Sequence, residues 1–508
     1  MAPGVAPGVA PGVAPGVADV ARDTPRPGVL RTGVLSMVAI AALGLTRLVH
    51  GSLVSRATDP ATYGRVGVMI AVTTIASLLL PAGVASAVSK FVPFFAGGGN
   101  PVAARAAYRA LSWFGLGGAL VFGLGCAAAA AAVLDLSTQD TAQVAALAVA
   151  FSLYSIGKAA LYGYERVPAY VRLELCTSGL AVLATVVVVL SGSTLYLVPL
   201  ALGYAVFAVV ARWLVRAEAA GGQLRPAPVA LPRAEIAGFV VLACLGTLAS
   251  QGFLQGTQLL AVRFATAAEV GYFAAAVTLV APMYFLPRAL GLALFPAMAR
   301  ARGAGDVATV RRHADLSTRA LLITLAPLFA AGILLAREVL VLFGDASFAG
   351  GVTVLQLMLA ATFLAVCAVA AVNALSSGER WQVRTPVAAA VAGCLTGLAA
   401  VALLGGPLGA AGVGLGYLIG TAVTAAGPAV AVWRQHRMAW RGPVVGALAT
   451  VFGALGLALA ITVADVSPGP RVAVDVGVAL AAGALSVGLL RHHLRAVARE
   501  ARHARATR

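Results

Sequence analysis

Four basic residues interrupt long apolar runs of this sequence: Arg47, His50, Lys90 and Arg288. A charge inside a bilayer costs about 2.5–3.5 kcal/mol on insertion scales, so such residues are functional candidates. A guanidinium holds a phosphate through two parallel hydrogen bonds, and an ammonium offers a point charge. We therefore expect Arg47, Lys90 and Arg288 to bind an anionic substrate group such as a phosphate or pyrophosphate. Snorkelling of these side chains to the membrane interface is the open alternative.

A face of uncharged polar residues marks the apolar segment Ile236–Val262. It consists of Thr247, Gln251, Gln255 and Gln258. Steps of four, four and three residues place these side chains on one side of a helix. Unpaired amides are unfavourable in lipid, so this side meets protein or water, as a sugar-binding cavity wall or through interhelical hydrogen bonds. Asn373 and His50 are further candidates for the wall, and His50 could instead be a packed, hydrogen-bonded residue.

The residue pattern does not indicate a catalytic site, a metal site or a carboxylate that couples transport to ions. No Ser/His/Asp arrangement, carboxylate pair or metal-binding cluster is visible, and the five cysteines each stand alone in apolar runs. The carboxylate nearest to the middle of an apolar run, Glu174, stands close to the start of its segment beside Arg172. Carboxylate-based coupling to Na⁺ or H⁺ therefore has no obvious carrier. We expect no enzymatic activity, no cofactor and no metal.

The elements that position these residues are predicted to be transmembrane helices. Of the 508 residues 60% are hydrophobic and only 11% are charged, whereas soluble domains carry roughly 25% charged residues. Apolar runs of about 20 residues can cross a bilayer, so we predict an all-α integral membrane fold of about fourteen helices. The predicted spans are Val29–Ser55, Tyr63–Ser89, Ala107–Leu134, Ala142–Leu161, Ala169–Leu190, Leu195–Val215, Ile236–Val262, Val270–Ala297, Thr318–Phe343, Val352–Leu375, Thr385–Leu404, Gly409–Trp433, Val444–Val463 and Val472–Leu490.

The positive charges predict the orientation of these helices. With the N-terminus in the cytoplasm, 29 of the 36 Lys and Arg residues fall in cytoplasmic segments and five in external ones, as the positive-inside rule requires. This alternation supports an even number of helices, with both termini cytoplasmic and the chain in the inner (cytoplasmic) membrane. It also accounts for the net charge of +18 without nucleic acid. The external loops Ser191–Thr194 and Gly405–Leu408 are bare turns.

The order of polar and apolar segments predicts the domains. Residues 1–28 repeat Ala-Pro-Gly-Val four times, which predicts a disordered tail. Two six-helix lobes then suggest a transporter with its pathway between them. The predicted divisions are an N-terminal lobe at 29–216, a cytoplasmic linker at 217–235, a C-terminal lobe at 236–440, an extra helix pair at 441–490 and a basic tail at 491–508.

Short strings at element boundaries carry a family resemblance. The string from Arg56 to Gly64 looks like the Arg–acidic–Tyr-Gly turn after the first helix of polysaccharide-unit flippases. Further matching strings run from Pro81 to Phe91, Ala268 to Phe273, Leu294 to Ala297, Leu342 to Phe348, Val354 to Gln356 and Pro407 to Val413. Together they cover most of residues 30–435, and the chain resembles the multidrug/oligosaccharidyl-lipid/polysaccharide exporter superfamily. Thr257 departs from the pattern, because many members carry an acidic residue near that position.

The resemblance implies a flippase that works by alternating access. We expect it to move a polyprenyl-(pyro)phosphate-linked oligosaccharide or polysaccharide unit across the membrane. Its expected partners are the lipid-linked glycan, membrane lipids and glycan polymerases or glycosyltransferases. One alternative is a multidrug exporter of the same fold, which should show an acidic cavity. Another is a membrane glycan polymerase or ligase, which should show a large external loop.

Overall fold

A computed structural model describes residues 29–97, 100–220, 231–284, 294, 298, 301, 306–377 and 380–463. All regular elements within these ranges are helices. Eleven of the described helices are long and apolar enough to cross a membrane, which agrees with the predicted all-α membrane fold. The tail at 1–28, most of the linker, Arg288, the fourteenth predicted helix and the basic tail lie outside the described residues.

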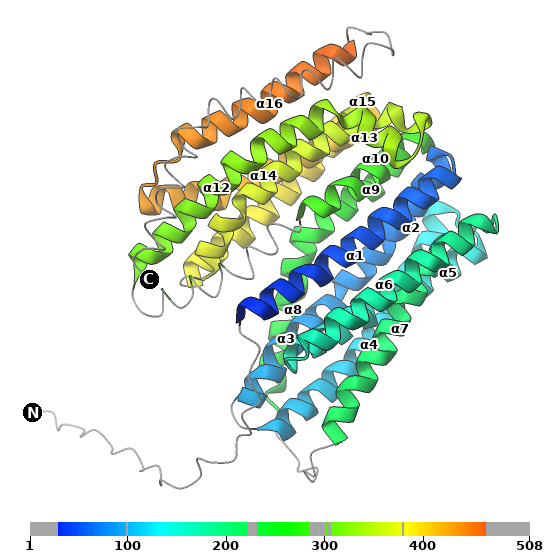
Figure 1. Ribbon diagram of the computed structural model, residues 1–508, viewed down its shortest axis with the longest axis vertical. Helices are drawn as coiled ribbons and strands as arrows, with labels where there is room; N and C mark the ends of the chain where they lie inside the picture. Colours follow the sequence, from blue (N-terminus) through cyan, green and yellow to red (C-terminus); the bar gives the residue numbers. More distant parts are fainter. Residues whose placement is uncertain are drawn as a thin grey trace, which may run out of the picture.

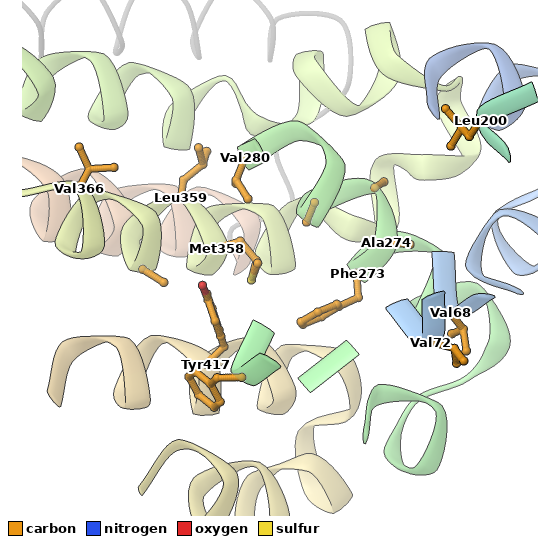
Figure 2. Packing of buried hydrophobic residues seen from close by; sticks show 14 of the residues in the cluster. Val68, Val72, Leu200, Phe273, Ala274, Val280, Met358, Leu359, Val366 and Tyr417 are labelled. Carbon is orange, nitrogen blue, oxygen red and sulfur yellow. The ribbon is translucent and has the colours of Figure 1, made fainter. Parts of the chain in front are cut away.

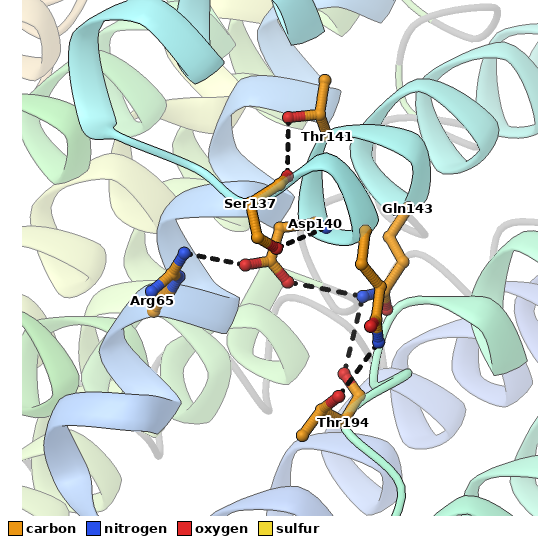
Figure 3. A network of polar contacts seen from close by, with 7 residues as sticks. Arg65, Ser137, Asp140, Thr141, Gln143 and Thr194 are labelled. Carbon is orange, nitrogen blue, oxygen red and sulfur yellow. Dashed lines mark hydrogen bonds and ion pairs between the residues drawn. The ribbon is translucent and has the colours of Figure 1, made fainter.

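The N-terminal lobe contains seven helices, which form one bundle in Figure 1. They are α1 (Val29–Ala57), α2 (Pro60–Leu79), α3 (Pro81–Gly97), α4 (Pro101–Leu134), α5 (Thr138–Gly163), α6 (Val167–Leu190) and α7 (Val198–Ala220). Helix α5 packs against α2, α3, α4 and α7, and α1 packs against α6. At the predicted external end, Arg65 forms a 2.8 Å ion pair with Asp140, and Gln139 and Gln143 bond to Thr194 (Figure 3). These contacts fix α2, α5 and the turn before α7 relative to one another.

The C-terminal lobe follows, with α16 on its outer flank beside α12 (Figure 1). Its elements are α8 (Arg233–Thr247), η1 (Leu248–Gly252), α9 (Phe253–Phe264), α10 (Ala267–Val280), η2 (Ala281–Tyr284), α12 (Val307–Leu334), α13 (Ala336–Phe343), η3 (Ala346–Gly351), α14 (Val352–Ser376) and α15 (Arg380–His436). Helix α16 (Arg441–Val463) is the described helix of the predicted extra pair. Helix α14 is buried along most of its length between α10, α12 and α15. Figure 2 shows Phe273, Met358 and Tyr417 from three of these helices turned toward one another.

Two single-helix predictions are wrong in detail. The span Tyr63–Ser89 is divided at Leu80 into α2 and α3, because Pro81 has no N–H to continue the helical bonding. The span Thr318–Phe343 is α12, which begins earlier at Val307, followed by the separate short helix α13. Asp306 caps α12 by accepting from Thr309 N–H at 2.9 Å. Hydropathy misses this polar first part of the helix because the cap and the charged turns after it are not apolar.

Helices eleven and twelve are joined one residue later than predicted. A turn was expected at Gly405–Leu408, and the kink between the two helical stretches of α15 is at Gly409, with φ 56° and ψ −136°. The 57 residues of α15 would extend about 85 Å if straight, far more than one crossing needs. A side chain at Gly409 would have its Cβ 2.8 Å from Glu269 Oε1. The corner therefore requires glycine for its backbone angles and for its contact with α10.

Candidate functional site

Three of the strings that carry the family resemblance, Arg56–Gly64, Ala268–Phe273 and Leu342–Phe348, meet in one place, at the predicted external end between the two lobes. Near the end of α1, Ser52 and Ser55 donate hydrogen bonds to the backbone oxygen of Phe343, at 2.7 and 3.2 Å. Arg56 donates to the neighbouring oxygen of Leu342. Two backbone carbonyls in the last turn of α13, which have no partner within the helix, are thus satisfied by side chains of the other lobe. We call the contacts among α1, α2, α10, α13 and η3 the external closure.

Aromatic packing continues the external closure around Tyr63. Its ring makes edge contacts with Phe343 and Phe348, at centroid distances of 5.9 and 5.7 Å. Its hydroxyl lies 3.1 Å from the hydroxyl of Thr278 on α10. The sequence strings around Tyr63 and Phe348 therefore belong to one packed cluster that joins the lobes.

Glycines let α2 and α10 approach closely within the external closure. A Cβ at Gly64 would lie 2.6 Å from the backbone nitrogen of Gly271. A Cβ at Gly271 would overlap the carbonyl of Pro60, and one at Gly67 would overlap the side chain of Ala274. Small residues permit such close helix contacts in membranes. The lobes can separate at this end only by losing these contacts together.

Arg47 lies inside the N-terminal lobe, within an aromatic surround. Its Nε donates to the hydroxyl of Tyr204 at 3.0 Å. Its guanidinium carbon lies 4.9 Å from the ring centroid of Phe151 and 5.9 Å from that of Tyr204. Its two terminal nitrogens make no hydrogen bond within the described residues. The guanidinium is therefore held in place by α5 and α7 and keeps donors for an anion.

A buried carboxylate close to Arg47 is the main feature that sequence reasoning did not use. Glu174 is the eighth residue of α6, is 2% exposed, and is the one acidic residue among the buried polar residues of the described N-terminal lobe. It accepts a 2.9 Å hydrogen bond from Tyr154 on α5. It also interacts electrostatically with Lys158 and Arg47. Three ionisable groups on three helices thus compensate one another, as buried charges require.

His50 extends this polar core along α1. Its Nδ1 lies 3.0 Å from the hydroxyl of Thr185, which also bonds to the backbone oxygen of Ala181. Its Nε2 is buried and has no hydrogen-bond partner among the described residues. One turn of α1 separates it from Arg47, so both side chains lie between α1 and its neighbours in the N-terminal lobe. An assignment of His50 to a sugar-binding wall stays a prediction.

Lys90 lies near the predicted cytoplasmic end, on α3. Its side chain is exposed, and Nζ lies 4.8 Å from the ring centroid of Phe91 and 4.3 Å from that of Phe239 on α8. The ammonium is therefore placed where the two lobes adjoin, with its charge accessible. The third predicted phosphate ligand, Arg288, lies outside the described residues. The structure thus brings Arg47 into the polar core but leaves Lys90 at a separate position.

The glutamines do not share one environment. Gln251 is exposed, Gln255 is half-buried and Gln258 is 3% exposed beside Gly67 of α2. The prediction assumed a continuous α-helix, but the π-helix η1 interrupts it at Leu248–Gly252. Such segments are rare and frequent at functional sites. On α14, Asn373 has a buried Nδ2 without a hydrogen-bond partner among the described residues.

Comparisons with known proteins bear on the fold and the family. Residues 53–347 match the family model described as polysaccharide biosynthesis protein, so the match includes most of the external closure. A comparison with curated protein sequences found no match. Among solved structures, an inward-facing multidrug resistance transporter of the MATE family, in the MOP superfamily, is similar with a TM-score of 0.62 and 14% identity, over 78% of this chain and 98% of that one. The lipid II flippase MurJ, in an inward closed conformation, is similar with a TM-score of 0.60 and 11% identity, over 91% and 99%. These likenesses confirm the predicted fold class.

Proposed function

The chain belongs to the polysaccharide biosynthesis protein family, and we propose that it is a flippase for a polyprenyl-(pyro)phosphate-linked glycan unit. The observation that carries this proposal is the external closure between two lobes of a transporter fold. It joins the lobes at one end through side-chain-to-carbonyl hydrogen bonds and glycine contacts. Alternating access requires such a contact to form and break. The similar structures, a lipid II flippase and a multidrug transporter, support transport but not a particular substrate.

Three cationic residues serve the phosphate in this proposal. Lys90, exposed where the lobes adjoin, attracts the headgroup from the predicted cytoplasmic leaflet. Arg47, deeper in the N-terminal lobe, offers its two terminal nitrogens to the phosphate while Tyr204 holds Nε. Arg288 is proposed as a third ligand on sequence grounds. Gln251, Gln255 and Asn373 would contact sugar, because amides pair with hydroxyl groups in both directions.

The charge balance favours an anionic over a cationic substrate. In the N-terminal lobe, Arg47 and Lys158 surround the single buried carboxylate of Glu174. A multidrug exporter that takes cations would need free negative charge at its binding site. Flipping of a phosphate-linked glycan is therefore the function that we propose.

Replacing the proposed phosphate ligands should stop glycan export. We expect Arg47→Ala and Arg288→Ala each to lower export at least tenfold, and the corresponding lysine variants to restore it only partly, because lysine lacks the paired donors. The measurement is surface glycan and accumulated lipid-linked precursor in a deletion strain complemented at matched protein level. Arg109→Ala, an exposed position on α4, is the matched control. Full export by Arg47→Ala and Arg288→Ala would remove both residues from the substrate site.

Reporter fusions test the proposed orientation. Fusions after Gly222 and Gly303 should read cytoplasmic, whereas fusions within Ser191–Thr194 should read external, because positively charged segments stay inside. The measurement is the paired activity of a reporter active only in the cytoplasm and one active only outside. An external result at Gly222 would contradict the orientation and place the external closure at the wrong end for the proposed cycle.

A further inference from the structure

A basic pocket opens at the predicted cytoplasmic end of the C-terminal lobe, away from the polar core. It lies between the first turns of α12 and the end of α15 and has a volume of about 830 Å³. Arg311, Arg312 and Arg437 line it together with His436 and Asp315. These charges were interpreted from the sequence only as markers of orientation. The structure gathers them from two helices around one concave surface, which a topological role alone does not require.

The arginines of this pocket lack a free carboxylate. Asp315 is the one acidic residue of the lining, and its Oδ1 already accepts from Arg319 Nε at 3.0 Å and from Trp440 Nε1 at 2.7 Å. The three guanidiniums of the lining therefore share one carboxylate, and that carboxylate is already hydrogen-bonded to Arg319 and Trp440. The pocket carries a net charge of +2 with His436 neutral. Such a site attracts an anion, and guanidiniums match phosphate oxygens in geometry.

The local backbone holds one of these arginines in place. Arg437 has φ of 47°, in the left-handed region that few residues other than glycine adopt. The turn is fixed by two bonds between its flanks. Trp433 Nε1 donates to the backbone oxygen of Met438 at 2.7 Å, and Met438 N–H donates to the oxygen of Trp433 at 3.2 Å. Arg437 is thus positioned by a rigid turn instead of a flexible chain end.

The pocket also lies at the ends of two predicted membrane crossings. Val307 begins α12 and His436 ends α15, and both lie beyond the predicted apolar spans Thr318–Phe343 and Gly409–Trp433, where lipid headgroups are expected. Arg441, which begins α16, stacks over Trp433 with 5.7 Å between the guanidinium carbon and a ring centroid. Tryptophan is enriched at this level of membrane proteins, and basic pockets between helices on the cytoplasmic side bind anionic headgroups.

We propose that the pocket of Arg311, Arg312 and Arg437 binds the phosphate headgroup of an anionic phospholipid from the predicted cytoplasmic leaflet. The bound headgroup connects the start of α12 to the end of α15. It neutralises a charge cluster that would otherwise separate them by repulsion. Binding of anionic lipid therefore stabilises the C-terminal lobe, whatever glycan the protein transports.

Lipid binding by the purified full-length protein tests this proposal. Phosphatidylglycerol titrated into a neutral detergent should raise the thermal unfolding midpoint, and native mass spectrometry should show the lipid retained. The triple variant Arg311→Gln, Arg312→Gln and Arg437→Gln should need at least tenfold more phosphatidylglycerol for the same shift. The control triple variant, Arg109→Gln, Arg172→Gln and Arg384→Gln, removes the same charge from exposed positions elsewhere and should behave as the unmodified protein. The proposal would be overturned if both triple variants lost the response to phosphatidylglycerol equally. It would also be overturned if phosphatidylcholine raised the unfolding midpoint as much as phosphatidylglycerol does.

Two further experiments identify the source of the bound phosphate and test a variant that should keep its fold. Inorganic pyrophosphate and polyprenyl phosphate are titrated in the same assay, and each should act only at concentrations well above those of phosphatidylglycerol. If pyrophosphate raises the unfolding midpoint at lower concentration than phosphatidylglycerol, the pocket binds a soluble anion. If polyprenyl phosphate does so, the pocket binds the substrate. Either result overturns the proposal. Arg437→Gly accepts φ of 47° without strain, so it should keep the turn and still weaken lipid binding several-fold.

Discussion

Gly271→Ala should reduce glycan export at least tenfold without lowering the amount of protein in the membrane. The added methyl group would overlap the carbonyl of Pro60, and a backbone group cannot move aside as a flexible side chain can. The lobes would then fail to meet at the external closure, which the transport cycle must pass through. Export is measured as surface glycan in a complemented deletion strain. Gly117→Ala is the matched control, because a Cβ there meets no atom within 4 Å.

A reversible cross-link tests the same contact by holding the external closure shut, whereas Gly271→Ala should keep it from forming. A Cβ at Gly51 would lie 2.9 Å from Cγ2 of Thr278 on the other lobe, so Gly51→Cys with Thr278→Cys would bring two sulfurs within bonding reach. In a background whose five native cysteines are replaced, oxidation should stop export and a reductant should restore it. Normal export by Gly271→Ala, or by the fully oxidised pair, would show that the external closure does not open and close during transport.

Glu174→Gln should produce the second large effect, on stability. Glutamine keeps the shape of the side chain and an oxygen for the Tyr154 hydroxyl, but it removes the negative charge that compensates Arg47 and Lys158. Removing one partner of a buried ionic group costs about 3–5 kcal/mol, because the remaining charge is left uncompensated. We therefore expect a thermal unfolding midpoint several degrees lower in detergent, with weaker export as a consequence.

A double variant identifies the cause of this loss. Lys158→Met in the Glu174→Gln background removes an uncompensated cation and should recover part of the lost stability, so the two changes should not be additive. Glu235→Gln makes the same chemical change at an exposed position and should shift the midpoint little. If Glu174→Gln is as stable as the unmodified protein, the native carboxyl group carries no charge that its neighbours need.

The sequence predicted the helices well where the signal is local. Length and apolarity alone placed α1, α6 and α14 within a few residues of their observed ends. The signal failed where helix structure depends on single backbone groups. Pro81 divides a run that hydropathy reads as continuous, and η1 changes the helical phase within an unbroken apolar segment. Apolarity measures transfer into lipid, and it contains no information on which carbonyl is bonded to which N–H.

The candidate site was predicted in part. The intramembrane position of Arg47 follows from its apolar neighbours in sequence, but the sequence could not show that Tyr204 and Phe151 surround it. Glu174 appeared to stand near the start of its helix beside Arg172, where water would solvate it. In the structure it faces Tyr154, because the rotation of α6 turns this side chain toward α5. Helix rotation is set by packing with neighbours, so a single-helix pattern does not determine it.

The sequence by itself determined that this is a multi-helix membrane protein, because the free energy of transfer into lipid depends on each segment alone. The short strings that resemble flippases also reside in the sequence, since they are runs of a few residues. Only the tertiary structure decided that strings almost 300 residues apart, at Arg56 and Leu342, join in one external closure. It also decided that arginines of α12 and α15 line one pocket. Such pairings depend on how whole helices pack, and packing is a property of the assembled bundle.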